Sequence, residues 1–362
     1  MYDFLNTLSG LIWGPITLIL ILGTGIFLSL GLKGFTFTYI LVAFKQIFKK
    51  DEKATDGEIT SFQSLTTALS ATVGTGNIAG VATAIYIGGP GAVFWMWVSA
   101  LFGMATKYAE AFLAIKYREK NANGETVGGP MYYIKNGLSK NYIIFAYLFA
   151  LAGMIAALGI GNGVQVNSVS QVIESEFGIS AFTVGIFIAL LVALVILGGI
   201  KSIGKITSKL VPLMSAIYIL GGLWIIVLNY SEVTYIFNLI TTSAFTSTAA
   251  TGGFAGATVW MALRYGVARG VFSNEAGLGS SPIAHAAANT NNPAKQGMIS
   301  MLEPLIDTLI VCTITAFVIL MSNLWIGEIN GGVLTVASFE QLLSNDKYIV
   351  IFGLMLFSFS TI

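Results

Sequence analysis

The sequence predicts an all-α polytopic membrane protein, and three observations carry that prediction. Apolar side chains make up 55% of the 362 residues and charged side chains only 10%, against about 25% charged residues in soluble domains. The mean hydropathy is +0.81. Long apolar runs recur along the whole chain, many of them near the ~20 residues that a helix needs to cross a bilayer. A water-soluble domain is therefore excluded.

Nine apolar runs are candidate spans, and two of them are interrupted by glycine and polar residues. The runs cover 11–32, 59–88, 90–115, 141–174, 181–199, 206–228, 254–288, 297–322 and 346–362. The first run lacks the basic start and the cleavage site of a signal peptide, so we expect it to be retained. The last run reaches Ile362 without a polar flank, and we expect further helices to follow it.

Lysine and arginine gather in alternate loops, whereas the loops between them carry acidic residues. The basic loops are 33–57, 116–140, 200–209 and 289–296. Because basic loops stay on the cytoplasmic side, this alternation predicts a multi-pass protein of the cell membrane with its N-terminus outside. Segment 35–50 is too short and too basic to span, and we expect it to lie as a helix at the membrane interface.

Composition removes several classes of function. A net charge of +1 gives no electrostatic basis for binding nucleic acid. One cysteine, Cys312, and one histidine, His285, do not provide the ligand spacing of a zinc site or the nucleophile and base of a hydrolase. We therefore predict neither an enzyme nor an organic cofactor. An ion channel is disfavoured because no tandem carbonyl filter or charged ring is visible.

The first interruption is the run SATVGTGNIAG, from Ser70 to Gly80, with Gly74, Gly76 and Asn77 inside it. Unwound backbone in a bilayer leaves polar groups that each cost several kcal/mol unless protein, water or a ligand satisfies them. The alternative is helix packing, because Gly76 and Gly80 form a GxxxG motif. A dinucleotide-binding motif is a poor explanation, since no strand precedes the glycines. This motif alone leaves unwinding and packing open.

The second interruption runs from Arg269 to Gly279 and places Ser273, Asn274 and Glu275 between glycines. A carboxyl group at membrane depth is functional by default. Two such breaks, one in each half of the chain, are typical of transporters built from inverted repeats, with the substrate between the breaks. Half-helix N-termini would then face an anionic group, while freed carbonyls would coordinate a small cation.

Counting the spans supports an inverted repeat. Residues 1–57 would hold an extra N-terminal spanning helix and the interfacial helix. Residues 58–228 would form the first repeat of five helices, and 229–362 would begin a second repeat that enters from the opposite side.

Four stretches resemble the alanine or glycine:cation symporter family, over essentially the whole chain. They are Ser61–Gly80, Gly88–Tyr117, Gly128–Tyr133 and Gly266–Asn289. The resemblance implies the leucine-transporter type of fold, with five plus five helices and two of them discontinuous. It also implies sodium-coupled import of alanine or glycine by alternating access, with Na⁺ as the coupling ion. The oligomeric state stays open.

The resemblance also implies a set of binding residues. Thr75 and Gly76 would present backbone to the substrate carboxylate, with Asn77 nearby, and Phe272 and Ser273 would be the aromatic lid and a polar contact. The full substrate set is Thr75, Gly76, Asn77, Gln165, Phe272, Ser273, Asn274, Glu275 and Gly277. The sodium set is Ser70, Val73, Ser360 and Thr361; such hard oxygen ligands suit an alkali cation.

Several polar residues have two possible roles each. Glu275 departs from an uncharged position of the related transporters, and our hypothesis is that it accepts the substrate ammonium or orients Asn77. It also keeps proton coupling open, as an alternative to sodium. Gln165 is either a substrate contact or an interhelical hydrogen-bonding residue, and Arg269 either closes an outer gate or reaches the interface.

Two pairs of charged residues also have two possible roles each. Lys107 with Glu110, and Glu303 with Asp307, are neighbours on helix faces. Either pair could form an inner gate or bind a proton, but a structural ion-pair network is an equally good explanation.

Overall fold

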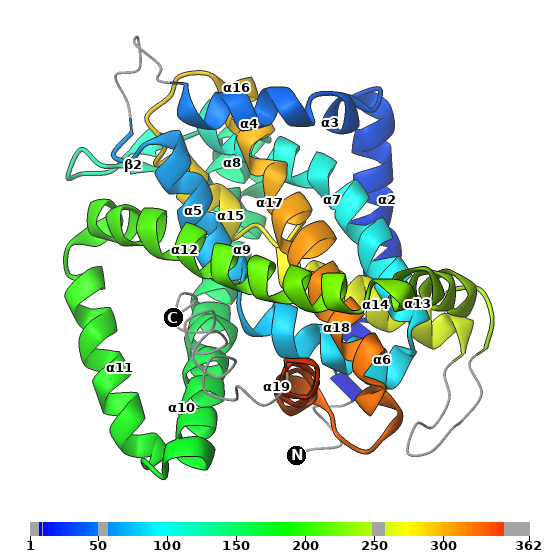
Figure 1. Ribbon diagram of the computed structural model, residues 1–362. Coiled ribbons are helices and arrows are strands. Elements are labelled where there is room, and N and C mark those ends of the chain that lie inside the picture. The colour runs from blue at the N-terminus through cyan, green and yellow to red at the C-terminus, as the bar shows by residue number, and fades with distance from the viewer. Residues whose placement is uncertain (1–6, 9, 50–56, 248–257, 344–362) are drawn as a thin grey trace.

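The computed structural model describes residues 7–8, 10–49, 57–247 and 258–343 (Figure 1), and nearly all of this part of the chain is helical. The longer elements are α2 (Pro15–Gly31), α4 (Ile40–Phe48), α5 (Ser61–Thr72), α6 (Val81–Gly88), α7 (Gly91–Lys116), α8 (Pro130–Gly137), α9 (Ile143–Ala156), α10 (Val164–Phe177), α11 (Ala181–Ile196), α12 (Gly199–Leu228), α13 (Tyr230–Ser243), α14 (Val259–Asn274), α16 (Pro293–Ser300), α18 (Thr313–Ser322) and α19 (Gly331–Leu342).

Short helical segments join these elements. They are α3 (Phe35–Thr38), α15 (Ser281–Ala286), α17 (Leu302–Pro304), the π-helices η1 (Gly76–Gly80), η3 (Ala157–Gly163) and η4 (Leu305–Cys312), and the 3₁₀ turns η2 (Lys140–Tyr142) and η5 (Leu324–Ile326). One antiparallel hairpin, β1 (Glu119–Lys120) with β2 (Thr126–Val127), interrupts the all-helical pattern.

Several helices are long and apolar enough to cross a membrane, which confirms a polytopic membrane protein. Among the described residues they are Gly91–Lys116, Lys140–Gln171, Gly199–Leu228 and Pro293–Ser322. A fifth span consists of Ser61–Thr72 and Gly76–Gly88, which meet at a bend of 50°. The predicted first broken helix is therefore confirmed. Pro15–Gly31 and Ala181–Ile196 are apolar but shorter, and the predicted run 346–362 lies outside the described residues.

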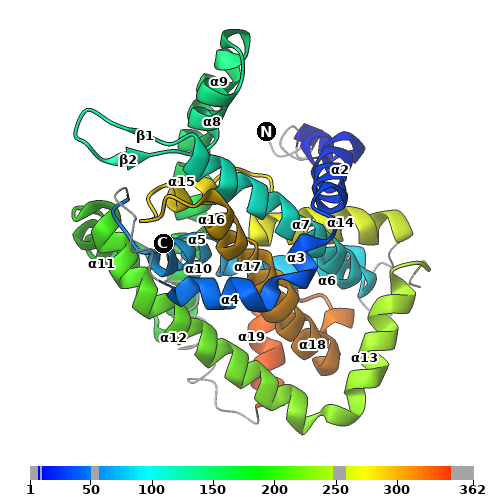
Figure 2. The ribbon, with the colours of Figure 1, turned by 90° about the horizontal axis from the view of Figure 1, so that it is seen from above.

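The second interrupted run also divides into two helices, α14 and α15. Helix α14 packs along α7, which crosses the centre of the molecule (Figure 2). Two glycines on α14 allow this approach, because a side chain at Gly266 would collide with the backbone oxygen of Ala92 and one at Gly270 with the hydroxyl of Ser99.

Three of the basic segments lie together at one end of the molecule (Figure 1). Figure 1 shows α4, α8, α16 and the hairpin together at one end, whereas the turn from α10 to α11 and the connection from α18 to α19 lie at the other. This arrangement fits the alternation of loop charges. Segment 35–50 forms α3 and α4, and Ala43 and Ile47 of α4 are buried.

Two predicted loops are wrong in the structure. Residues 200–209 belong to α12, because lysine is a good helix former and its long side chain reaches water from a helix as well as from a loop. The connection after Leu228 contains α13, a 14-residue helix. Its polar residues, including Glu232 in the first turn, masked the helical period.

Candidate functional site

The first break consists of residues 73–75, between α5 and η1, and side chains satisfy its backbone. The amide of Gly74 donates to Oδ1 of Asn77 at 2.7 Å, and the amide of Thr75 donates to Oε1 of Gln165 at 3.4 Å. Val73, Thr75, Asn77 and Gln165 are all buried. Unwound backbone is therefore tolerated here because neighbouring amide side chains replace the lost helical partners.

The second break consists of residues 275–280, between α14 and α15, and has a different backbone. Glu275, Gly277 and Gly279 all have positive φ, at 54°, 90° and 80°. Glycine adopts this left-handed region at little cost, whereas Glu275 adopts it at a steric cost because it has a side chain. The side chain of Asn274 supports the turn, because its Oδ1 accepts from the amide of Ala276 at 3.0 Å.

A buried carboxylate on η4 joins the two breaks. Asn77 donates through Nδ2 to Oδ1 of Asp307 at 2.7 Å and to the hydroxyl of Ser273 at 3.0 Å. Ser273 and Thr308 in turn donate to Oδ2 of Asp307, at 2.8 and 2.7 Å. Asn77, Ser273, Thr308 and Asp307 each have an exposed fraction of 0%. We call these four residues the Asp307 cluster.

The second asparagine reaches the same helix. Nδ2 of Asn274 donates to the hydroxyl of Thr308 at 3.0 Å, so each break sends an amide side chain into η4. Such π-helical turns are frequent at functional sites.

The two breaks also approach each other closely. A side-chain carbon at Gly76 would lie 3.3 Å from Cα of Ser273 and 3.7 Å from the ring of Phe272. The guanidinium of Arg269 lies over that ring, 5.6 Å from its centre, within the range of a cation–π interaction. The structure thus brings together Gly76, Phe272 and Arg269, as well as the polar residues described above.

Other predicted site residues lie elsewhere. The carboxylate of Glu275 accepts from Ser280, and Asn77 is oriented by Asp307 and Ser273, so the hypothesis that Glu275 orients Asn77 is wrong. Gly277 is exposed at the surface of the second break. Ser70 and Val73 are buried at the end of α5, whereas Ser360 and Thr361 lie outside the described residues.

Asp307 is the residue that sequence reasoning did not select. It was paired with Glu303 on one helix face, but the two carboxylates diverge, and Glu303 bonds Lys107 at 2.9 Å. The wider turn of η4, which begins at Leu305, changes the angular offset that an α-helix would impose. The sequence feature that indicates Asp307 is its acidic side chain within an apolar run, because an acid inside the membrane is functional by default.

Within the described ranges, no group of three or more His, Cys, Asp or Glu side chains could hold a metal ion. The oxygen donors near the end of α5 are backbone carbonyls and hydroxyls such as that of Ser70, which prefer hard cations.

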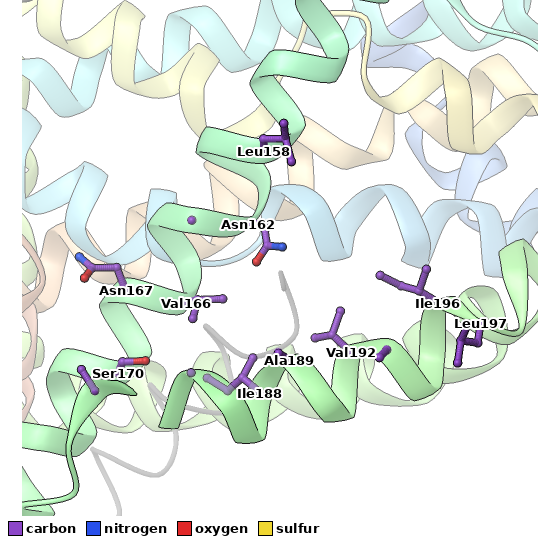
Figure 3. A pocket seen from close by; sticks show the side chains of 14 residues that line it. Leu158, Asn162, Val166, Asn167, Ser170, Ile188, Ala189, Val192, Ile196 and Leu197 are labelled. Carbon is purple, nitrogen blue, oxygen red and sulfur yellow. The ribbon is translucent and has the colours of Figure 1, made fainter. Parts of the chain in front are cut away.

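A pocket of about 760 Å³ lies apart from the breaks, between α10 and α11 (Figure 3). Its lining is mainly apolar, and the polar side chains in it are Asn162, Asn167 and Ser170. It contains none of the residues of the Asp307 cluster, and we assign no binding role to it.

Comparisons with known proteins give a consistent family. Residues 1–362 match the sodium:alanine symporter family. The sodium/alanine symporter AgcS of Methanococcus maripaludis is 50% identical, over 99% of this chain and 80% of that protein. Two Bacillus subtilis proteins are also similar. The putative sodium/proton-dependent alanine carrier YrbD is 43% identical over 90% of this chain and 65% of its own length. The probable sodium/glutamine symporter GlnT is 38% identical over 87% of this chain and 64% of its own length.

Proposed function

This chain belongs to the sodium:alanine symporter family, and from that premise we propose that it imports alanine or glycine with Na⁺ by binding both between its two helix breaks. It is a sodium-coupled amino-acid symporter and not an enzyme. The name of the M. maripaludis relative supports alanine as the substrate.

The Asp307 cluster is the observation that carries this proposal. It holds the first break against the end of α14 through buried hydrogen bonds. Hydrogen bonds to a charged group are worth about 1.5–3 kcal/mol each. A site built from two broken helices needs such a link, because otherwise each half could shift independently of the other.

The substrate carboxylate would bind the backbone of Thr75 and Gly76. The amide of Thr75 already faces an oxygen, Oε1 of Gln165, at the long distance of 3.4 Å. A carboxylate oxygen is a stronger acceptor than an amide oxygen and would displace it, leaving Gln165 to bind the substrate. A side-chain carbon at Gly76 would lie 3.7 Å from the ring of Phe272, so we expect room for a small substrate side chain only.

The coupling ion would bind at the end of α5. Ser70 and Val73 supply oxygen atoms directly before the first break, and Ser360 and Thr361 would complete the ligand set from a later helix. Asn274, Glu275 and Gly277 would line the second break, and Arg269 would act with Phe272 as an outer gate.

This assignment places the residues in a leucine-transporter type of inverted repeat. Residues 58–228 would form the first repeat and 229–362 the start of the second, behind an N-terminal unit of residues 1–57. The N-terminus would lie outside the cell membrane, and the basic end formed by α4, α8 and α16 would face the cytoplasm.

The test is uptake into liposomes that contain the purified protein. Radiolabelled alanine is supplied with an imposed Na⁺ gradient, and K⁺ and H⁺ gradients are the controls. We expect uptake with the Na⁺ gradient alone. Uptake with the H⁺ gradient alone would overturn sodium coupling, and the absence of uptake under every gradient would overturn the substrate assignment.

A matched pair of serines tests the ion site. Ser70 and Ser208 each donate to the carbonyl three residues earlier, at 2.7 and 3.0 Å, but only Ser70 lies beside a break. Ser70→Ala should raise the Na⁺ concentration at half-maximal uptake by about tenfold, the equivalent of ~1.4 kcal/mol. Ser208→Ala should leave it unchanged, and equal behaviour of the two variants would remove Ser70 from the site.

A further inference from the structure

A second group of buried polar residues centres on Glu303. Its carboxylate accepts from Lys107 at 2.9 Å, from Ser281 at 2.7 Å and from Ser300 at 2.7 Å. It also pairs with Nε2 of His285 at 2.6 Å. Both carboxylate oxygens of Glu303 therefore have partners, and one of these partners is the ammonium group of Lys107.

Glu110 lies one helical turn from Lys107 and is much less well satisfied. Its exposed fraction is 8%, and its Oε2 has no hydrogen-bond partner. The groups that interact with its carboxyl group include the backbone amides of Gly277 and Gly279. A side-chain carbon at Gly277 would lie 3.8 Å from the methyl group of Thr106, one turn before Glu110 on α7, so this buried acid lies beside the second break.

Each element packed around Glu110 contributes known charged or titratable groups. Helix α7 contributes Lys107, α17 contributes Glu303, and α8 contributes Tyr133. The second break adds Glu275, which interacts with Lys107, and α15 adds His285, which interacts with Glu303. Lys107 thus interacts with four carboxyl groups, since Asp307 of η4 is the fourth, and it bonds Glu303.

Such an excess of carboxyl groups has a definite cost. An ionised carboxylate that is buried without a full set of partners is strongly disfavoured, whereas a neutral carboxylic acid is tolerated far better. Among these acids, Glu303 bonds Lys107, Asp307 accepts from Asn77, Ser273 and Thr308, and Glu275 accepts from Ser280. Glu110 gains the most from binding a proton.

We propose that Glu110 is a proton-binding site that controls the conformation of the second break. When ionised, Glu110 attracts the amides of Gly277 and Gly279 and holds residues 275–280 against α7. When a proton binds, the negative charge is lost, and these interactions weaken because charge-assisted hydrogen bonds are about twice as strong as neutral ones. The break is then free to take another backbone conformation.

The second break is built to respond in this way. Gly277 and Gly279 have φ values that glycine can leave and re-enter at low cost. Leu278, between them, is 40% exposed, whereas Gly279 is buried and a side chain there would lie 2.6 Å from Pro130. Ala276 is fixed more firmly, because a side chain at Gly103 of α7 would lie 2.9 Å from its Cβ.

The consequence for transport rests on the proposed function, whereas the conformational effect does not. Since the second break would line the substrate site, its release would couple the pH on one side of the membrane to sodium-driven uptake. The conformational effect can be measured without any substrate.

A cysteine at position 278 reports on the break. Cys312 is 2% exposed, so the unsubstituted protein provides the labelling blank. The rate of maleimide labelling of Leu278→Cys is measured in liposomes from mildly acidic to mildly alkaline pH, with and without Glu110→Gln. The ratio of the two rates at each pH cancels the ionisation of the thiol itself.

We expect Glu110→Gln to label about tenfold faster at alkaline pH, as the loss of one charge-assisted interaction implies, and the ratio to approach one at acidic pH. Glu110→Asp, which keeps an acid, should retain the pH dependence. A ratio that does not change with pH would overturn the proposal, because a packing defect acts equally at every pH. An effect of Glu275→Gln in place of Glu110→Gln would also overturn it.

Uptake gives the second readout. Sodium-driven alanine uptake should vary with pH in the unsubstituted protein and lose that variation in Glu110→Gln. If the unsubstituted protein takes up no alanine under any gradient, the proposed substrate is wrong, and the labelling ratio still decides the role of Glu110.

Discussion

Each of the two helix breaks is held by an asparagine, but the two asparagines donate to different kinds of partner. In each, the oxygen of an asparagine side chain accepts from a nearby backbone amide, and its nitrogen donates to η4. Asn77 reaches the carboxylate of Asp307, whereas Asn274 reaches the hydroxyl of Thr308. The first break is buried throughout, but Gly277, Leu278 and Ser280 of the second break are exposed.

This difference indicates a division of labour. A buried break whose amides bond side chains has few alternative conformations, so it is suited to hold a substrate and an ion in fixed geometry. A break with three residues of positive φ and an exposed centre has more alternatives, so it is suited to change shape. The predictions below test that contrast.

The largest effect is expected from Asn77→Ala. The substitution removes the acceptor of the Gly74 amide and one of the donors to the buried carboxylate of Asp307. We expect the stability of the transport-competent site to fall by about 2 kcal/mol, which lowers the uptake rate roughly thirtyfold. Asn274→Ala, which removes only bonds between uncharged groups, should cost about 1 kcal/mol, or roughly fivefold. Initial rates of sodium-driven uptake in liposomes measure both.

A double substitution separates the two roles of Asn77, which are to accept from the amide of Gly74 and to donate to the carboxylate of Asp307. If Asp307 is the partner that makes Asn77 important, adding Asp307→Asn to Asn77→Ala should cost less than the sum of the single changes. Simple addition of the two losses, or equal losses from Asn77→Ala and Asn274→Ala, would contradict the contrast between the breaks.

An intermediate effect is expected from Gly76→Ala. The new carbon would lie 3.3 Å from Cα of Ser273 and would push the breaks apart by a few tenths of an ångström. We expect the alanine concentration at half-maximal uptake to rise about fivefold, the equivalent of the ~1 kcal/mol at the lower end of the cost of overpacking. Gly80 is the control, since a side chain there has nothing within 4 Å. A similar rise for Gly80→Ala would show that helix propensity, and not the approach of the breaks, is responsible.

The smallest effect is expected from Glu275→Gln. Its carboxylate accepts from Ser280 and does not bond the Asp307 cluster, so alanine affinity and sodium dependence should change by less than about twofold, the equivalent of ~0.4 kcal/mol. Equilibrium binding of alanine at several Na⁺ concentrations is the measurement. A tenfold loss of affinity would restore Glu275 as a ligand of the substrate ammonium.

Part of the site follows from local sequence. The glycines around Thr75 and the polar run from Ser273 to Glu275 mark the two breaks, because such residues weaken a helix wherever the fold places them. Local sequence is misleading at 200–209, because the lysines there predict a loop but belong to α12. It also fails at 230–243, where a polar surface hides α13.

The sequence by itself determined that the chain is a membrane protein with two interrupted helices, since apolar content and glycine position act locally on burial and backbone. Only the tertiary structure decided which side chains meet across those interruptions. Asn77 and Asp307 are separated by 230 positions, and their contact depends on how η1 and η4 are rotated and packed against each other. The π-helical turn at η4 adds an offset that α-helical spacing does not contain. The side chain of Asp307 therefore points to the breaks, while that of Glu303 points to Lys107.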